Sequence, residues 1–261
     1  MSAEVAGSNL ALAADVIRVD ETIRSLRRTL KEASSVVALT GAGISAESGI
    51  RTFRGAGGLW RQYRPEKLAT PEAFERDPKL VWEWYDWRRA VIQAAKPNPG
   101  HAALAELESR TVKQGGSFTL ITQNVDGLHD RAGSRGIVKL HGDIWTVRCV
   151  GCGRSERNDQ VPLLPLPPHC ECGALMRPGV VWFGEPLPED EWERATKACA
   201  AAQIVLVIGT SATVYPAAGL AQAAQQAGAK MAVVNPEPTA LDEMAEWVLR
   251  GPSGELLPGL L

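Results

Sequence analysis

The chain has 261 residues, of which 45% are hydrophobic and 22% are charged, and its formal net charge is −2. This composition is that of an ordinary globular protein, and the balanced charge argues against direct nucleic-acid or membrane binding. No apolar run reaches the ~20 residues that cross a membrane, and the N-terminus lacks the basic and apolar segments of a signal peptide. We therefore expect a cytoplasmic protein in which residues 1–18 form a flexible tail.

The first predicted elements are a helix and a strand. Asp20 to Ala33 has apolar residues at helical spacing, and the apolar run Ser35 to Thr40, ending at Gly41, is typical of a buried parallel strand. Apolar runs with polar or glycine tips recur at residues 117–124, 202–211 and 229–237, with a helical stretch at residues 216–229. This repetition predicts an α/β fold with a doubly wound parallel sheet, which binds ligands at the carboxyl ends of its strands.

Two regions interrupt the repeat. Residues 55–114 are helical and rich in tryptophan, and residues 142–182 hold four of the five cysteines and a proline-rich stretch. We expect these inserts to pack together as a smaller domain. The larger domain then consists of residues 19–54, 115–141 and 183–261.

The stretch "GAGISAESGIRTFRGAGG", Gly41 to Gly58, follows the first predicted strand. Gly41 and Gly43 permit a tight turn that approaches a pyrophosphate closely, and the next helix supplies amide donors. A plain strand-to-helix turn is the alternative. Phe53 and Arg54 argue against it, because an aromatic ring can lie over a nicotinamide or adenine ring and a guanidinium can reach a phosphate.

Two further polar motifs follow predicted strands. Gln123, Asn124 and Asp126 come directly after an apolar run, where side chains meet a bound ligand or cap the next helix. His141 follows a short apolar segment and precedes Gly142. An ordinary pKa near 6.5 suits His141 to act as a general base, although a buried structural histidine is the commoner case.

Four cysteines form the pattern "CVGC…HCEC". With no export signal, a disulfide framework is not expected, and the C-x2-C pair has the spacing of a structural zinc site. Four thiolates leave no open position on the metal, so such an ion stabilises the insert and does no chemistry. The second pair is closer than usual, so His169 is an alternative ligand, and four unrelated thiols are the remaining possibility. The four cysteines are Cys149, Cys152, Cys170 and Cys172.

Tyr85 and Arg88, in the tryptophan-rich insert, are three residues apart. This spacing places them on one helix face, where a hydroxyl and a guanidinium together suit a carboxylate. On spacing alone, packing among the tryptophans is the simpler interpretation.

Taken together, these segments resemble the sirtuins, the NAD-dependent protein lysine deacylases. The resemblance runs from about Asp20 to the C-terminus, and its motifs come in the family's order: "GAGISAESGIRTFRG", "TQNVDGLHDRAG", "KLHGD", the four cysteines, "RPGVVWFGE", "GTS" and "VVNPE". It implies a Rossmann-like large domain, a small domain with one structural zinc, and NAD as a co-substrate in the cleft between them.

The resemblance also implies roles for individual residues. His141 is the catalytic base, and Asn124 belongs to the catalytic group. The implied cofactor-binding residues are Gly41, Ala42, Gly43, Phe53 and Arg54 in the cofactor loop; Gln123, Asn124 and Asp126 at the nicotinamide and its ribose; Gly209, Thr210 and Ser211 on the phosphate side; Asn235 and Glu237 at the adenosine ribose; and Ser253 at the adenine.

The implied partners are acylated lysine side chains of proteins, and we expect the protein to be a monomer. Val180 to Glu185 is expected to be a strand that pairs with an extended substrate peptide, with Val181, Trp182 and Phe183 at the acyl-lysine. In the implied reaction the acyl oxygen attacks the ribose C1′ and nicotinamide leaves. His141 then takes a ribose hydroxyl proton, and the products are lysine and O-acyl-ADP-ribose.

Three residues point to a subclass. Tyr85 and Arg88 match the pair by which desuccinylase and demalonylase sirtuins hold an acidic acyl chain, and the small Ala69 matches a position where their pocket widens. We expect removal of succinyl or malonyl groups, with weaker deacetylation. The alternatives are a deacetylase without this preference, a mono-ADP-ribosyltransferase and a non-catalytic NAD sensor.

Overall fold

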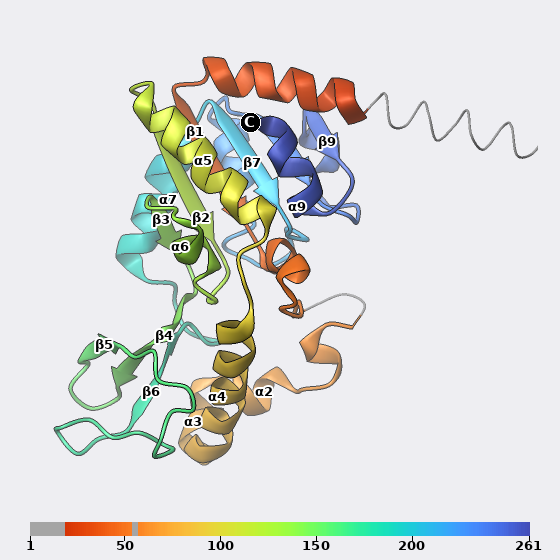
Figure 1. Ribbon diagram of the computed structural model, residues 1–261. Helices are drawn as coiled ribbons and strands as arrows, with labels where there is room; N and C mark the ends of the chain where they lie inside the picture. Colours follow the sequence, from red (N-terminus) through yellow and green to blue (C-terminus); the bar gives the residue numbers. More distant parts are fainter. Residues whose placement is uncertain (1–18, 54–56) are drawn as a thin grey trace, which may run out of the picture.

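The computed structural model describes residues 19–53 and 57–261. Its centre is a six-stranded sheet in the order β3-β2-β1-β7-β8-β9, and every neighbouring pair is parallel (Figure 1). The strands are β1 (Ser35–Thr40), β2 (Ser117–Thr122), β3 (Ile137–Lys139), β7 (Ile204–Ile208), β8 (Lys230–Val234) and β9 (Trp247–Leu249). The predicted doubly wound α/β fold is confirmed.

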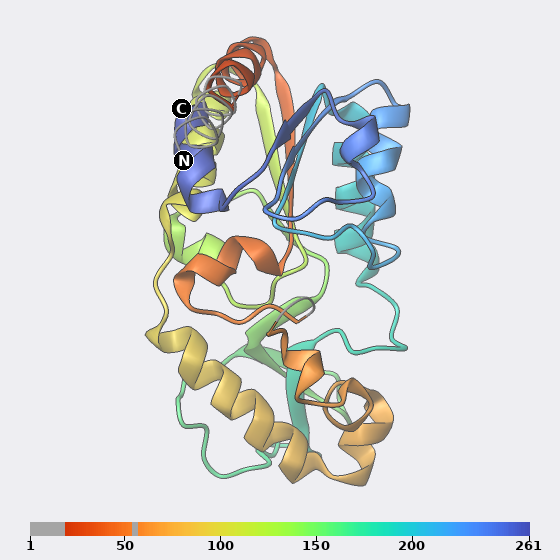
Figure 2. The ribbon, with the colours of Figure 1, turned by 90° about the vertical axis from the view of Figure 1, so that its right-hand side faces the viewer.

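Helices cover both faces of this sheet (Figure 2). One face carries the helix at residues 19–32, α5 (Pro99–Lys113) and α9 (Ser253–Leu256); the other carries α7 (Glu189–Ala201) and α8 (Gly219–Gln226). Successive side chains of a strand point to opposite faces. In β1, Val36 and Ala38 therefore pack into one core, while Val37 and Leu39 pack into the other. Burial on both faces explains why these strands are continuous apolar runs.

The two inserts lie together beyond the carboxyl edge of the sheet (Figure 1). One supplies α2 (Pro65–Leu68), α3 (Pro71–Arg76) and α4 (Pro78–Ala94), and the other supplies a three-stranded sheet of β5 (Ser155–Arg157), β4 (Gly142–Cys149) and β6 (Met176–Val180). A single apolar core joins them, and the Nε1 of Trp82 donates a 2.8 Å hydrogen bond to the carbonyl of Met176. The domain boundaries given above stay a prediction.

Some predicted elements differ from the structure. The segment Val180–Glu185, predicted as a strand, contributes only Val180 to β6, and the remainder forms a turn in which the N–H of Glu185 donates to the carbonyl of Trp182. Gly184 permits this turn, because its φ of 89° suits glycine. The helix expected after Gly41 is a 3-10 helix, η1 (Ala42–Ser48).

The remaining elements are short. They are α6 (Leu128–Ala132) and the 3-10 helices η2 (Leu59–Arg61), η3 (Asp242–Met244) and η4 (Leu257–Leu260). Within residues 19–53 and 57–261, no helix has the length and apolar character needed to cross a bilayer.

Candidate functional site

The glycines of the first motif allow two loops to touch at the carboxyl edge of the sheet. The N–H of Gly43, after β1, donates a 2.7 Å hydrogen bond to the carbonyl of Gly209, after β7. A Cβ on Gly43 would lie 2.7 Å from the Gly209 Cα, and one on Gly41 would lie 2.7 Å from the Cβ of Thr210. Two segments predicted to bind the cofactor, the loop after β1 and the loop after β7, are thus in contact.

The polar residues after β2 complete this edge with Ser45, which the sequence analysis missed. The Ser45 hydroxyl donates a 2.8 Å hydrogen bond to Asp126, and the amide nitrogen of Asn124 donates to the Gly41 carbonyl at 3.0 Å and to Ser45 at 3.3 Å. Asn124 and Asp126 are buried, and burial raises the pKa of Asp126. Gln123 reaches Thr210 at 3.4 Å. A helix-capping role alone does not explain side chains that bridge two loops.

His141 lies at the point where β3 leads into β4. Its Nδ1 lies 2.9 Å from the backbone carbonyl oxygen of Gln123. Because a carbonyl oxygen can only accept a hydrogen bond, Nδ1 carries a proton and donates it. The neutral ring then keeps Nε2 as the proton acceptor. Burial lowers the pKa of His141 below the ordinary 6.5, although the Gln123 carbonyl opposes this. A general base requires a neutral imidazole near pH 7 with an unprotonated nitrogen, which the Nε2 of His141 supplies.

The residues predicted at the adenosine end extend along the same edge. The Asn235 amide donates a 2.7 Å hydrogen bond to the carbonyl of Glu237, and Asn235 is buried while Glu237 is exposed. Ser253 is buried at the start of α9, and Ser211 is exposed after β7 with its hydroxyl 2.9 Å from that of Thr213. The prediction for Arg54 lies outside the described residues.

A second group of predicted residues meets inside the smaller domain. The Nε1 of Trp182 donates a 2.9 Å hydrogen bond to the Tyr85 Oη, and the N–H of Phe183 donates a 3.0 Å hydrogen bond to the Ala69 carbonyl. Trp182 and Tyr85 are buried, whereas Phe183 is 47% exposed. The N–H of Val181 donates to the carbonyl of His141 at 2.9 Å. This hydrogen bond joins the acyl-site segment directly to the predicted base.

Arg88 belongs to this group and has an unusual environment. It is 5% exposed, and its guanidinium carbon lies 4.9 Å from the centre of the Phe53 ring and 5.8 Å from that of Trp84. In the described part of the chain its guanidinium makes no hydrogen bond or salt bridge to another side chain. Burial lowers the pKa of Arg88 to about 10. The charge of Asp126 acts on Arg88 without an ion pair in direct contact, and a ligand carboxylate that binds the guanidinium would relieve the remaining cost of burying it.

Four cysteines of the second insert are positioned for zinc. The sulfur atoms of Cys149, Cys152, Cys170 and Cys172 all lie within 4.8 Å of one another, and none forms a disulfide. The N–H groups of Gly151 and Cys152 donate to the Cys149 sulfur, which favours the thiolate that binds metal. His169 is not a member of this group. The residues fit a closed tetrahedral Zn²⁺ site and leave no position for substrate.

The Sir2 family model matches residues 41–216. The chain belongs to the Sir2 family. The NAD-dependent protein deacylase 2 of Pyrobaculum aerophilum is 55% identical over 226 residues, which cover 86% of this chain and 89% of that protein. A Sir2 homologue solved as a complex with NAD is 49% identical, with a TM-score of 0.84 and 91% of each chain covered.

A further solved Sir2 protein shows a peptide complex. It carries a deacetylated p53 peptide and 3′-O-acetyl ADP ribose, and it is 33% identical with a TM-score of 0.82. The alignment covers 91% of this chain and 96% of that protein. Among these relatives, one is named an NAD-dependent protein deacylase, one is solved with NAD and one is solved with a peptide.

Proposed function

We propose that this Sir2 protein removes acyl groups from protein lysine side chains with consumption of NAD, and that it prefers succinyl and malonyl groups to acetyl. The observation that carries the acyl preference is Arg88, a buried guanidinium whose neighbours are aromatic rings. Family membership supports the deacylase activity, and the deacylase relative and the NAD-bound homologue support the co-substrate.

The NAD site in this proposal is the carboxyl edge of the sheet. The glycines of the β1 and β7 loops admit a pyrophosphate, and Asn124 and Asp126 lie beside them. When bound, NAD would supply a ribose carbon from which nicotinamide departs and a ribose hydroxyl that receives the acyl group as lysine leaves. Asn235, Glu237 and Ser253 extend the site toward the adenosine.

His141 acts as the general base in this proposal. Its Nδ1 is occupied by the Gln123 carbonyl, so the ring is held in one orientation and Nε2 is left to accept a proton. Nε2 takes a proton from a ribose hydroxyl, which makes that oxygen a nucleophile toward the acyl carbon. Burial keeps His141 neutral and therefore ready for this step near pH 7.

Tyr85 and Arg88 hold the acidic end of the acyl chain. The indole N–H of Trp182 can only donate, so the Tyr85 oxygen accepts that hydrogen bond and keeps its own proton for a carboxylate. Arg88, three residues later on the same side of α4, adds two parallel N–H donors and a positive charge. The small Ala69 belongs to the same buried core as Tyr85.

A comparison of acyl-lysine peptides tests this function. The purified protein is given NAD and one peptide sequence carrying acetyl-, succinyl-, malonyl- or glutaryl-lysine, and peptide and nicotinamide are followed by mass spectrometry. We expect stoichiometric nicotinamide release with all accepted peptides and the highest kcat/KM for an acidic acyl group. Highest kcat/KM on the acetyl peptide contradicts the acyl preference. No turnover on any of the four contradicts the deacylase function.

A further inference from the structure

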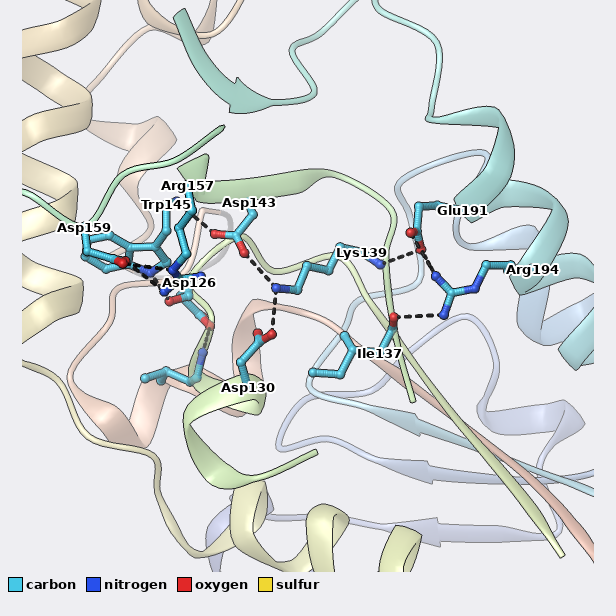
Figure 3. A network of polar contacts seen from close by, with 11 residues as sticks. Asp126, Asp130, Ile137, Lys139, Asp143, Trp145, Arg157, Asp159, Glu191 and Arg194 are labelled. Carbon is cyan, nitrogen blue, oxygen red and sulfur yellow. Dashed lines mark hydrogen bonds and ion pairs between the residues drawn. The ribbon is translucent and has the colours of Figure 1, made fainter. Parts of the chain in front are cut away.

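Lys139 occupies an unusual position close to the proposed base. It is the last residue of β3, two residues before His141, and its Nζ lies 2.8 Å from Asp130 Oδ1 and 2.7 Å from Asp143 Oδ2 (Figure 3). Asp130 is on α6, directly after the loop that carries Asn124 and Asp126 in the sequence. Asp143 is in β4, two residues after His141. The ammonium group of Lys139 therefore links α6, which follows the loop with Asn124 and Asp126, to β4, which follows His141.

The start of β4 depends on such side-chain contacts. The pairing of β4 with β6 is regular from Val147 onward, but its register shifts between Gly142 and Val147. In that irregular stretch, Asp143 Oδ1 accepts a 2.8 Å hydrogen bond from the N–H of Trp145, and the Trp145 indole donates a 2.9 Å hydrogen bond to the carbonyl of Asp126. The Asp143 carboxylate is thus held between Lys139 and Trp145.

The main chain of Lys139 is fixed as well. Since β3 is an edge strand, its outer N–H and carbonyl groups have no neighbouring strand, and α7 supplies their partners. The N–H of Lys139 donates to Glu191 at 3.2 Å, and Arg194 donates to the carbonyl of Ile137 at 3.2 Å (Figure 3). Glu191 and Arg194 also form a 2.9 Å ion pair. The lysine side chain therefore extends from an anchored backbone.

We infer that Lys139 is a positioning residue for His141, acting through Asp143 on the backbone that carries the imidazole. The Gln123 carbonyl fixes the ring of His141 through Nδ1. The Lys139–Asp143 contact fixes the position at which the backbone after His141 enters β4. Without the ammonium group, the carboxylates of Asp130 and Asp143 lose the cation that both contact. They then repel each other, and the segment that leads from His141 into β4 moves. This inference rests on the proposed deacylase function, in which His141 acts only after nicotinamide has left.

That order of steps provides the test. Lys139→Met removes the contact, Asp143→Asn removes the negative charge from it, Lys139→Arg retains a cation, and Lys79→Met is a matched control in an exposed Lys79–Glu83 pair on α4. Each variant is assayed with an acyl-lysine peptide for nicotinamide–NAD exchange and for O-acyl-ADP-ribose formation. We expect Lys139→Met and Asp143→Asn to slow product formation by about 10- to 100-fold, as loss of a supporting contact does elsewhere. Exchange remains close to wild type, and Lys139→Arg restores most of the product formation.

Two results overturn the inference: equal loss of exchange and product formation in Lys139→Met, which indicates general structural damage, or unchanged rates of both. Amide hydrogen exchange of residues 140–146 gives a readout independent of activity, and it should be faster in Lys139→Met than in Lys79→Met. If the wild-type protein catalyses neither reaction, the proposed function fails. The amide exchange then still decides whether Lys139 holds the His141 segment, and unchanged protection refutes that it does.

Discussion

The indole Nε1 of Trp182 donates a 2.9 Å hydrogen bond to the Oη of Tyr85, and both side chains are buried. The two residues come from different inserts, so this contact joins the helix that carries Arg88 to the segment that follows β6. Because the phenol oxygen accepts, its proton remains available. The hydroxyl that the sequence predicts as a carboxylate-binding group, with packing as the alternative, is thereby left with a proton to donate.

Tyr85→Phe tests two roles of the Tyr85 hydroxyl, which accepts a hydrogen bond from Trp182 and is proposed to donate one to the acyl carboxylate. The variant leaves the Trp182 N–H buried without a partner, so we expect a loss of about 1–3 kcal/mol in the free energy of unfolding. It also removes a donor to an acidic acyl chain, so kcat/KM should fall by about tenfold or more for a succinyl peptide, and much less for an acetyl peptide. Tyr215→Phe, at a 67% exposed tyrosine, is the matched control for urea unfolding and kinetics. Equal losses on both peptides argue against the donor role.

The pH dependence of catalysis tests the state of His141. Burial lowers its pKa below 6.5, and a base must be unprotonated to act. The kcat of deacylation should therefore be insensitive to pH between about 7 and 6.5 and should fall only at lower pH, where the ring takes up a proton. Steady-state rates at saturating NAD and peptide provide the profile. A fall that begins above pH 7 is incompatible with the depressed pKa.

Acid stability depends on another histidine, His129. Its Nε2 lies 3.1 Å from the Thr40 hydroxyl, its Nδ1 has no hydrogen-bond partner within residues 19–53 and 57–261, and burial lowers its pKa to about 3. The folded protein keeps this ring neutral, while the unfolded chain binds a proton near pH 6.5. The stabilising contribution is therefore complete above about pH 6.5 and is lost as the pH falls toward 3, at about 1.4 kcal/mol per pH unit.

Urea unfolding between pH 7 and 4.5 measures this contribution. His129→Asn should lower the stability at pH 7, and its free energy of unfolding should fall less steeply with decreasing pH than that of the wild type. The difference in slope should approach about 1.4 kcal/mol per pH unit below pH 6. Parallel curves for the two proteins would show that His129 is protonated equally in the folded and unfolded states.

Metal analysis tests the cysteine site. Cys170→Ser removes one of four thiolates whose sulfur atoms lie within 4.8 Å, so we expect loss of bound zinc and a lower melting temperature. His169→Ala should retain the metal, since His169 is outside that group. Zinc content by plasma emission spectroscopy after purification compares the two. Metal retained by Cys170→Ser but lost from His169→Ala would reverse the ligand assignment.

Much of the large domain could be predicted from the sequence, because a strand buried on both faces must be apolar throughout. The runs at Ser35–Thr40 and Ile204–Ile208 show this plainly. The strands β3 and β9 have only three residues each, too few for a recognisable period. The turn after Val180 was also missed, because Gly184 and the ion pair between Arg177 and Glu185 shape it, and the latter is a tertiary contact.

The site shows a similar division. Glycines, polar strand tips and cysteine spacing are local signals, and they pointed to the residues that meet at the carboxyl edge and at the sulfur cluster. Ser45 and Lys139 lie within the motifs GAGISAESGIRTFRG and KLHGD, but a serine in a turn and a lysine at a strand end are ordinary, so their residue types alone indicated no role. Their importance comes from partners that are distant or on neighbouring elements, such as Asp126 for Ser45. Contacts of this kind become visible only in the folded chain.

The acyl selectivity of Arg88→Met tests the central claim most directly. The measured quantity is the ratio of kcat/KM for succinyl-lysine to that for acetyl-lysine peptide, in the wild type and in the variant. A buried Arg–carboxylate contact is worth about 2–5 kcal/mol, so the ratio should fall by at least about 30-fold while deacetylation persists. If Arg88→Met reduces both activities by the same factor, Arg88 does not hold an acyl carboxylate and the proposed preference is wrong.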